Sequence, residues 1–156
     1  MLHIRGSKPT VQPIVGDDGD LWAFNGECYN LQTFTTSIEV GGDWIGCDGV
    51  VVGKNDEAPS SLSEECDTSI LYSSIISTGL TSTLSKLQGE YAYAYVNNET
   101  VSFGRDELGR RSLTSNVDLE GLEGEGEFEI EQLVVTSTGG GYEVPPGIMW
   151  EGRGLG

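Results

Sequence analysis

The segment Tyr91–Phe103 constrains the fold more than any other part of the sequence. Large and small side chains alternate in Tyr91-Ala92-Tyr93-Ala94-Tyr95-Val96, and a period of two is typical of a strand whose faces meet different neighbours. Asn97-Asn98 then predicts a turn, and Thr100–Phe103 predicts the returning strand. The chain is therefore expected to build a sheet around this hairpin.

A second strand and a helix are predicted from local patterns. Leu21–Phe24 is expected to form a strand that follows a turn at Gly16–Asp20 and ends at an Asn-Gly pair. A helix is expected from a start near Glu64 or Asp67 to an end at Gly79. Its evidence is the helical spacing of four apolar residues, Ile70, Leu71, Ile75 and Ile76.

The remaining segments complete an α+β fold class, with strands, then helix, then strands. Short strands are expected at Ile38–Val40 and Val50–Val52, a second helical stretch at Thr81–Leu87, a glycine-bracketed loop at Gly104–Leu113, one strand at Phe128–Val135 with Phe128, Ile130 and Leu133–Val135 buried, and a final strand reached through the loop that starts at Val144. One domain is expected over residues 1–150. Residues 118–127 look like an acidic insertion, and residues 151–156 like a frayed, disordered tail.

Charge and cysteine content exclude several classes of function. The 156 residues carry 8 Lys plus Arg against 25 Asp plus Glu, a net charge of −17, so we expect no nucleic-acid and no membrane-surface partner. No apolar run is long enough to span a bilayer. The three widely spaced cysteines and the single His3 argue against a disulfide framework or a zinc site. We predict a cytoplasmic protein without metal or cofactor.

The Asn25-Gly26 pair has two interpretations. Asn-Gly is a common hairpin turn. It also offers a side-chain amide and a backbone N–H, the two donors of an oxyanion hole, at a glycine that lets a substrate approach the backbone. The local sequence leaves both interpretations open.

Five short motifs stand in a fixed order along the chain. They are His3-Ile4-Arg5-Gly6, Gln12-Pro13-Ile14, Phe24-Asn25-Gly26-Glu27, Cys66-Asp67-Thr68, and Leu87–Ala94 followed by Gly104-Arg105-Asp106. This series resembles the glutaminase domain of class II glutamine amidotransferases in the asparagine synthetase family, and most of all the asparagine synthetase domain-containing proteins. The resemblance implies an N-terminal-nucleophile hydrolase fold, a layered αββα sandwich, and hydrolysis of glutamine to glutamate and ammonia for asparagine biosynthesis.

The resemblance also implies roles for individual residues. Arg5 matches the arginine that binds the α-carboxylate of glutamine, and Asp67 matches the aspartate that receives its α-ammonium. Asn25 and Gly26 match the oxyanion hole, and Glu27 helps to hold the backbone groups of glutamine. Without the resemblance, Arg5 would be read as a surface arginine and Asp67 as a helix N-cap.

Two further features are compared with the family: the Arg105-Asp106 motif and the nucleophile. Arg105 and Asp106 match a motif that we interpret as structural, tying strand to loop through an ion pair. The family nucleophile is an N-terminal cysteine, and this sequence begins Met1-Leu2-His3. Cys28 is internal and is not expected to replace it.

These departures lead to two expectations. The first is an N-terminally truncated, inactive glutaminase domain that lacks its first strand, with glutamine as ligand and a synthetase domain or subunit as partner. The alternative is a non-catalytic glutamine-binding or scaffolding module. An acidic interaction protein with no enzyme ancestry would require the order of the five motifs to be a coincidence.

Overall fold

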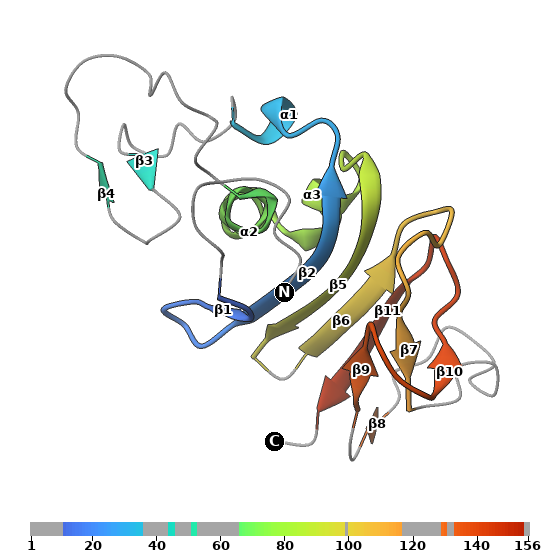
Figure 1. Ribbon diagram of the computed structural model, residues 1–156. Helices are drawn as coiled ribbons and strands as arrows, with labels where there is room; N and C mark the ends of the chain where they lie inside the picture. The colour runs from blue at the N-terminus through green and yellow to red at the C-terminus, as the bar shows by residue number, and fades with distance from the viewer. Residues whose placement is uncertain are drawn as a thin grey trace. The chain divides into compact units, whose positions relative to one another are not determined.

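The computed structural model describes residues 11–35, 44–45, 51–52, 66–98, 100–116, 129–130 and 133–154 (Figure 1). The chain divides into two compact units. The first unit consists of Met1–Val11 and Glu27–Gly89, and the second consists of Gln12–Gly26 and Glu90–Gly156. Helices and mainly antiparallel strand pairs occur together, so the predicted mixture of α and β structure is confirmed.

The largest sheet has six strands in the order β1-β2-β5-β6-β11-β8. Their bounds are β1 Ile14–Val15, β2 Leu21–Cys28, β5 Gly89–Asn97, β6 Thr100–Arg105, β8 Glu129–Ile130 and β11 Met149–Gly154. Most of this sheet belongs to the second unit, and only the C-terminal end of β2 and the first residue of β5 belong to the first. Figure 1 shows β2, β5, β6 and β11 as long, curved arrows.

Both local turns that the sequence predicts are present. In the hairpin, β5 and β6 pair antiparallel with Tyr95 opposite Ser102, and Asn98 adopts a positive φ of 51°, which asparagine tolerates well. The turn before β2 is closed by the N–H of Gly16, which donates to the carbonyl of Asp20 at 2.8 Å. Gly104 and Arg105, expected in a loop, instead extend β6.

A three-stranded sheet completes the second unit. Its order is β10 (Tyr142–Glu143), β7 (Thr114–Ser115) and β9 (Val135–Thr136). The core of the unit joins Ala92 and Phe103 of the large sheet to Leu113 and Val144, which adjoin strands β7 and β10 of the small sheet. The face of the hairpin that carries Ala92 and Phe103 is therefore packed against the small sheet and its flanking residues.

The prediction of one strand over Phe128–Val135 is wrong. β8 at Glu129–Ile130 pairs in parallel with β11, whereas β9 at Val135–Thr136 pairs with β7 in the other sheet. Local hydrophobicity does not show that the two ends of the segment pair with different sheets. Val134 is 48% exposed, so its predicted burial is also wrong, and Leu133 and Val135 are only half-buried.

The prediction of a frayed tail is wrong for residues 151–154. They continue β11, where Arg153 lies opposite Thr100 of β6. A strand pairing with a distant segment supplies the backbone hydrogen bonds that this glycine-rich sequence cannot make locally. The predicted acidic insertion at 118–127 and the predicted strand at Ile38–Val40 lie outside the described residues. Part of the predicted strand Val50–Val52 is present as β4 (Val51–Val52), paired with β3 (Trp44–Ile45).

The first unit contains the helices α1 (Gln32–Thr35), α2 (Asp67–Thr78) and α3 (Leu80–Leu84). The predicted end of α2 at Gly79 is confirmed: Gly79 has a φ of 88°, and its N–H donates to the carbonyl of Ile75. Ile70, Leu71 and Ile75 are buried, whereas Ile76 is 59% exposed. The second helical stretch is the short α3, which covers only part of Thr81–Leu87. None of the described helices is long and apolar enough to cross a membrane.

A cluster of aromatic rings lies on β2 and β5 within the second unit. The ring of Trp22 packs against Phe24, Tyr93 and Tyr95, with ring centroids 5.8 to 6.2 Å apart. Burial raises the pKa of Tyr93 well above its ordinary value. Burial also raises the pKa of Tyr95, and the carboxylate of Asp20, which accepts its hydroxyl at 3.3 Å, adds to this effect. These tyrosines are therefore held neutral.

Candidate functional site

Asn25 and Gly26 lie inside a strand and not in a turn. β2 continues from Leu21 to Cys28, so the hairpin-turn interpretation and the predicted end of the strand are both wrong. The N–H of Phe24, next to Asn25, donates to the side-chain oxygen of Gln12 at 2.7 Å. Gln12 comes from the second of the five motifs, and the structure thus brings two of the motifs together.

Gly26 has a packing reason to be glycine. A Cβ atom at this position would lie 2.1 Å from the carbonyl oxygen of Glu90 and 2.6 Å from the Cα of Tyr91. Real Cβ atoms do not approach backbone this closely, so a side chain here would push β5 away. The glycine is therefore needed by the sheet, whatever ligand its N–H serves.

A small hollow of about 220 Å³ lies beside Asn25 in the second unit. Alanines from two strands and apolar side chains from the opposite sheet line it together with a few uncharged polar groups. The lining includes Ala23, Asn25, Ala92, Leu113, Val135 and Ser137. None of the described residues that line it is charged, although the chain as a whole is strongly acidic, so the hollow suits a neutral group.

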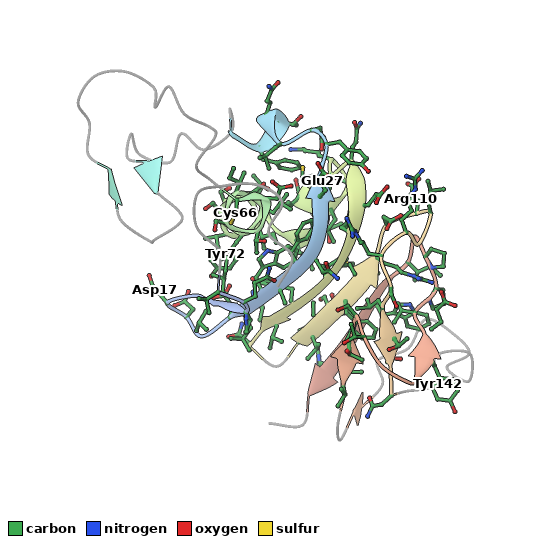
Figure 2. All side chains as sticks on the ribbon, viewed as in Figure 1. Asp17, Glu27, Cys66, Tyr72, Arg110 and Tyr142 are labelled. Carbon is green, nitrogen blue, oxygen red and sulfur yellow. The ribbon has the colours of Figure 1, made fainter. Side chains whose placement is uncertain are left out.

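Asp67 begins helix α2 in the first unit. Cys66 is the N-cap residue, and its side chain makes no capping hydrogen bond, so the interpretation of Asp67 as N-cap is wrong. Asp67 is buried, with 7% of its surface exposed. Figure 2 labels Cys66 at the start of α2 and Glu27 near the end of β2. Asp67, the first residue of α2, contacts the end of β2.

The two carboxylate oxygens of Asp67 have different surroundings. Oδ2 accepts the backbone N–H of Cys28, the residue after Glu27, at 2.7 Å. Oδ1 is buried and receives no hydrogen bond from any of the described residues. A buried, unsatisfied carboxylate oxygen is costly unless a donor, preferably a cation, binds it. Asp67 is thus equipped to receive an ammonium or guanidinium group.

The cysteines of the described segments are not placed as exposed nucleophiles. Cys28 is fully buried and Cys66 is 8% exposed. The thiol of Cys28 contacts the side-chain oxygen of Asn30 at 3.5 Å, and that of Cys66 contacts Ser69 at 3.1 Å. A reactive cysteine needs access and a cationic or basic neighbour, and neither of these contacts supplies a positive charge.

Arg105 and Asp106 form a structural centre in the second unit, but they do not pair with each other. Arg105 is 7% exposed, and its guanidinium donates to Glu143 at 2.6 Å. It also reaches the carbonyls of Gly109 and Arg111 at 3.4 Å. Arg105 therefore forms an ion pair, but with Glu143 and not within the Arg105-Asp106 motif as the sequence predicted.

Asp106 holds the loop after β6 together. Its carboxylate accepts backbone N–H groups from one residue of β5 and three residues of the loop, namely Tyr91, Leu108, Arg110 and Arg111. Every one of these partners belongs to the backbone, which is typical of a structural carboxylate. At the same loop, Arg110 pairs with Glu90 at 2.5 Å, and Figure 2 shows Arg110 at the edge of the unit.

The predicted site residues fall into three groups. Arg5 lies outside the described residues. Glu27 and Asp67 belong to the first unit, where Asp67 contacts the residue next to Glu27, whereas Asn25, Gly26, Arg105 and Asp106 belong to the second. Sequence reasoning missed Asn30, whose side chain bridges two backbone segments. An asparagine in the turn that follows a strand is a weak signal of such a role, because its carboxamide readily bonds nearby backbone.

No protein-family model and no curated protein matches the chain. Among solved structures, the chain is similar to glutamine phosphoribosylpyrophosphate amidotransferase from B. subtilis in complex with ADP and GMP. The two share 21% sequence identity with a TM-score of 0.46, over 70% of this chain and 23% of that chain.

Proposed function

We propose that the chain is a glutaminase-type domain that binds L-glutamine, of the class II glutamine amidotransferase kind. The observation that carries this proposal is the buried Oδ1 of Asp67, which no described residue satisfies. The ordered motifs of the sequence supply the identity of the ligand, because Asp67 stands in the motif that matches the receptor for the α-ammonium of glutamine. The finer assignment, to the asparagine synthetase family with its layered αββα fold, is part of the proposal.

The chemistry of glutamine fits the residues assigned to it. Its α-ammonium would donate to Oδ1 of Asp67, while the Cys28 N–H keeps Oδ2. Hydrogen bonds that involve a charged group contribute about 1.5–3 kcal/mol each. Arg5 is proposed to pair with the α-carboxylate and Glu27 to hold the backbone groups. Asn25 and the N–H of Gly26 are proposed to bind the oxygen of the neutral carboxamide.

Hydrolysis requires a nucleophile that the described cysteines do not provide. Cys28 and Cys66 are buried, and the family chemistry uses a cysteine whose own α-amino group is the base. We therefore propose that the polypeptide of residues 1–156 binds glutamine without releasing ammonia. A synthetase domain or subunit is the proposed partner, and the cytoplasm is the proposed location.

Isothermal titration calorimetry with L-glutamine tests the proposal. The 156-residue polypeptide should bind with a dissociation constant of about 1 mM or tighter, close to −4 kcal/mol. Asp67→Asn keeps the acceptor for Cys28 and removes the charge, so affinity should fall about 10- to 100-fold. Asp20→Asn is the matched control, because Asp20 is an equally buried carboxylate that accepts a tyrosine hydroxyl.

Two outcomes would reject the proposal. Absence of binding heat in the wild type, with the fold intact by circular dichroism, would exclude a glutamine site. Equal loss of affinity in Asp67→Asn and Asp20→Asn would show that Asp67 acts through general stability. A coupled ammonia assay on the same samples distinguishes a domain that only binds glutamine from an active glutaminase. Sustained ammonia release would identify the active enzyme.

A further inference from the structure

Asn30 connects two backbone segments of the first unit through both ends of its side chain. Its amide group donates to the carbonyl of Lys86 at 2.7 Å, and its side-chain oxygen accepts the N–H of Gln88 at 2.9 Å. Next to it, the N–H of Tyr29 donates to the carbonyl of Gln88 at 2.7 Å. Three hydrogen bonds thus fix the segment after β2 against the segment that leads into β5.

The segment that Asn30 holds is followed by a residue that lies against the peptide group bonded to Asp67. Gly89 follows Gln88, and a Cβ at Gly89 would lie 2.0 Å from the carbonyl oxygen of Glu27. That carbonyl belongs to the same peptide group as the Cys28 N–H, which donates to Oδ2 of Asp67 at 2.7 Å. The peptide is planar, so whatever fixes its carbonyl side also fixes the direction of its N–H.

We propose that Asn30 is a positioning residue for the ligand-binding carboxylate of Asp67. By holding the 86–88 segment in place, Asn30 keeps Gly89 against the Glu27–Cys28 peptide, and the N–H of that peptide occupies Oδ2. The other oxygen, Oδ1, then stays free for the ligand ammonium. The inference rests on the proposed function for the identity of the ligand, but the link between Asn30 and Asp67 is a property of the first unit alone.

Asn116 provides a comparison, because it also joins two backbone segments but lies in a different unit from Asp67. The side-chain oxygen of Asn116 also accepts a backbone N–H from a distant segment, that of Val134 at 2.8 Å. Asn116 lies in the second unit, whereas Asp67 and the Cys28 N–H that it accepts lie in the first. Asn116→Ala is therefore the matched control for Asn30→Ala.

The test combines nuclear magnetic resonance with calorimetry on the full 156-residue chain. In a ¹H–¹⁵N spectrum the Cys28 amide should lie downfield because it donates to a carboxylate. Asp67→Asn should move this peak upfield. Asn30→Ala should move it in the same direction in the wild type but by much less in the Asp67→Asn background, which separates the link to Asp67 from the direct contact of Asn30 with the Cys28 thiol. Asn30→Ala should also weaken L-glutamine binding about tenfold, as expected when hydrogen bonds that orient a ligand-binding group are lost. Asn116→Ala should change neither quantity.

The outcomes separate this inference from the proposed function. A wild type that binds no glutamine rejects the proposed function, while the Cys28 peak still reports on the link to Asp67. An unmoved Cys28 peak in Asn30→Ala, or equal effects of Asn30→Ala and Asn116→Ala, overturns the positioning role. If Asn30→Ala does not fold, Asn30→Asp retains the acceptor for Gln88 and loses the donor to Lys86. Its Cys28 peak should also move upfield, and an unmoved peak overturns the role.

Discussion

Two buried aspartates of this chain have opposite surroundings. Asp106 is 4% exposed, and its carboxylate accepts backbone N–H groups from four residues, three of them in its own loop. Asp67 is 7% exposed, accepts one N–H, from Cys28, and leaves Oδ1 without a donor from the described residues.

The comparison separates a carboxylate that the fold itself satisfies from one with an oxygen left for a ligand. Both residues stand in sequence motifs singled out above, and both are buried, so neither the motif nor burial distinguishes them. The number of backbone N–H groups that donate to each carboxylate does distinguish them. Asp106 is satisfied by the fold, whereas Asp67 has spare capacity for a cation.

The largest expected effect is on stability, at Asp106. Asp106→Ala removes the acceptor of several backbone N–H groups and should lower the free energy of unfolding by about 3 kcal/mol. Asp67→Asn should change it by less than about 1 kcal/mol, because the Cys28 N–H keeps an acceptor. Urea unfolding at constant slope measures both. Equal destabilisation by the two variants would remove the comparison.

Gly26→Ala tests whether the proposed oxyanion residue is also a packing residue. The added Cβ would meet the backbone of Glu90 and Tyr91 at less than 3 Å, so we expect a loss of about 2 kcal/mol from forced strand separation. Gly140→Ala is the control, since nothing lies within 4 Å of a Cβ there. A Gly26→Ala variant as stable as Gly140→Ala would show that β2 and β5 are not that close.

The pH dependence of stability tests whether the buried hydroxyl of Tyr93 stays protonated in the folded chain. It extends the comparison of buried ionisable groups from aspartates to a tyrosine. Burial raises the pKa of Tyr93 in the folded chain above its ordinary value of 10.0. The unfolded chain therefore loses this proton first, and stability present below about pH 10 should fall as the pH rises further, by up to about 1.4 kcal/mol per pH unit for one tyrosine. Tyr93→Phe should flatten this slope in urea unfolding between about pH 9 and 11. An unchanged slope would contradict the burial of the hydroxyl.

The smallest expected effect concerns the partner of Arg105. The side chain of Glu143 is 73% exposed, and water screens such a pair, so Glu143→Gln should cost about 0.5–1 kcal/mol. Glu107→Gln, at an exposed glutamate of the neighbouring loop, should cost less. A loss above about 3 kcal/mol for Glu143→Gln would indicate that Arg105 depends on this ion pair as a buried charge does.

Sequence reasoning succeeded where the structure is decided locally. The alternation in Tyr91–Val96, the Asn97-Asn98 turn and the glycine that ends α2 are properties of short segments, and all three are confirmed. The motif of Cys66-Asp67 was placed correctly at the start of a helix, although Cys66 and not Asp67 is the N-cap.

The failures arise from contacts between distant segments. β2 runs past Asn25-Gly26 because its neighbour in the sheet is β5, which a local Asn-Gly pattern does not reveal. Residues 151–154, expected to be a frayed tail, form part of a strand because β6 pairs with them. The spare oxygen of Asp67 and the satisfied oxygens of Asp106 depend on which backbone N–H groups the fold brings near, and no spacing in the sequence encodes that.

The stabilisation that L-glutamine confers on the folded chain shows directly whether Asp67 binds the ligand. A ligand that binds only the folded chain raises the free energy of unfolding, by about 2.7 kcal/mol at a concentration about 100 times the dissociation constant. We predict this rise for the wild type and for Asp20→Asn. For Asp67→Asn, whose affinity is expected to be about 10- to 100-fold weaker, the rise at the same concentration should be only about 0.4–1.4 kcal/mol. A rise of equal size in Asp67→Asn would contradict the account, because the unsatisfied oxygen of Asp67 would then not be the ligand's binding partner.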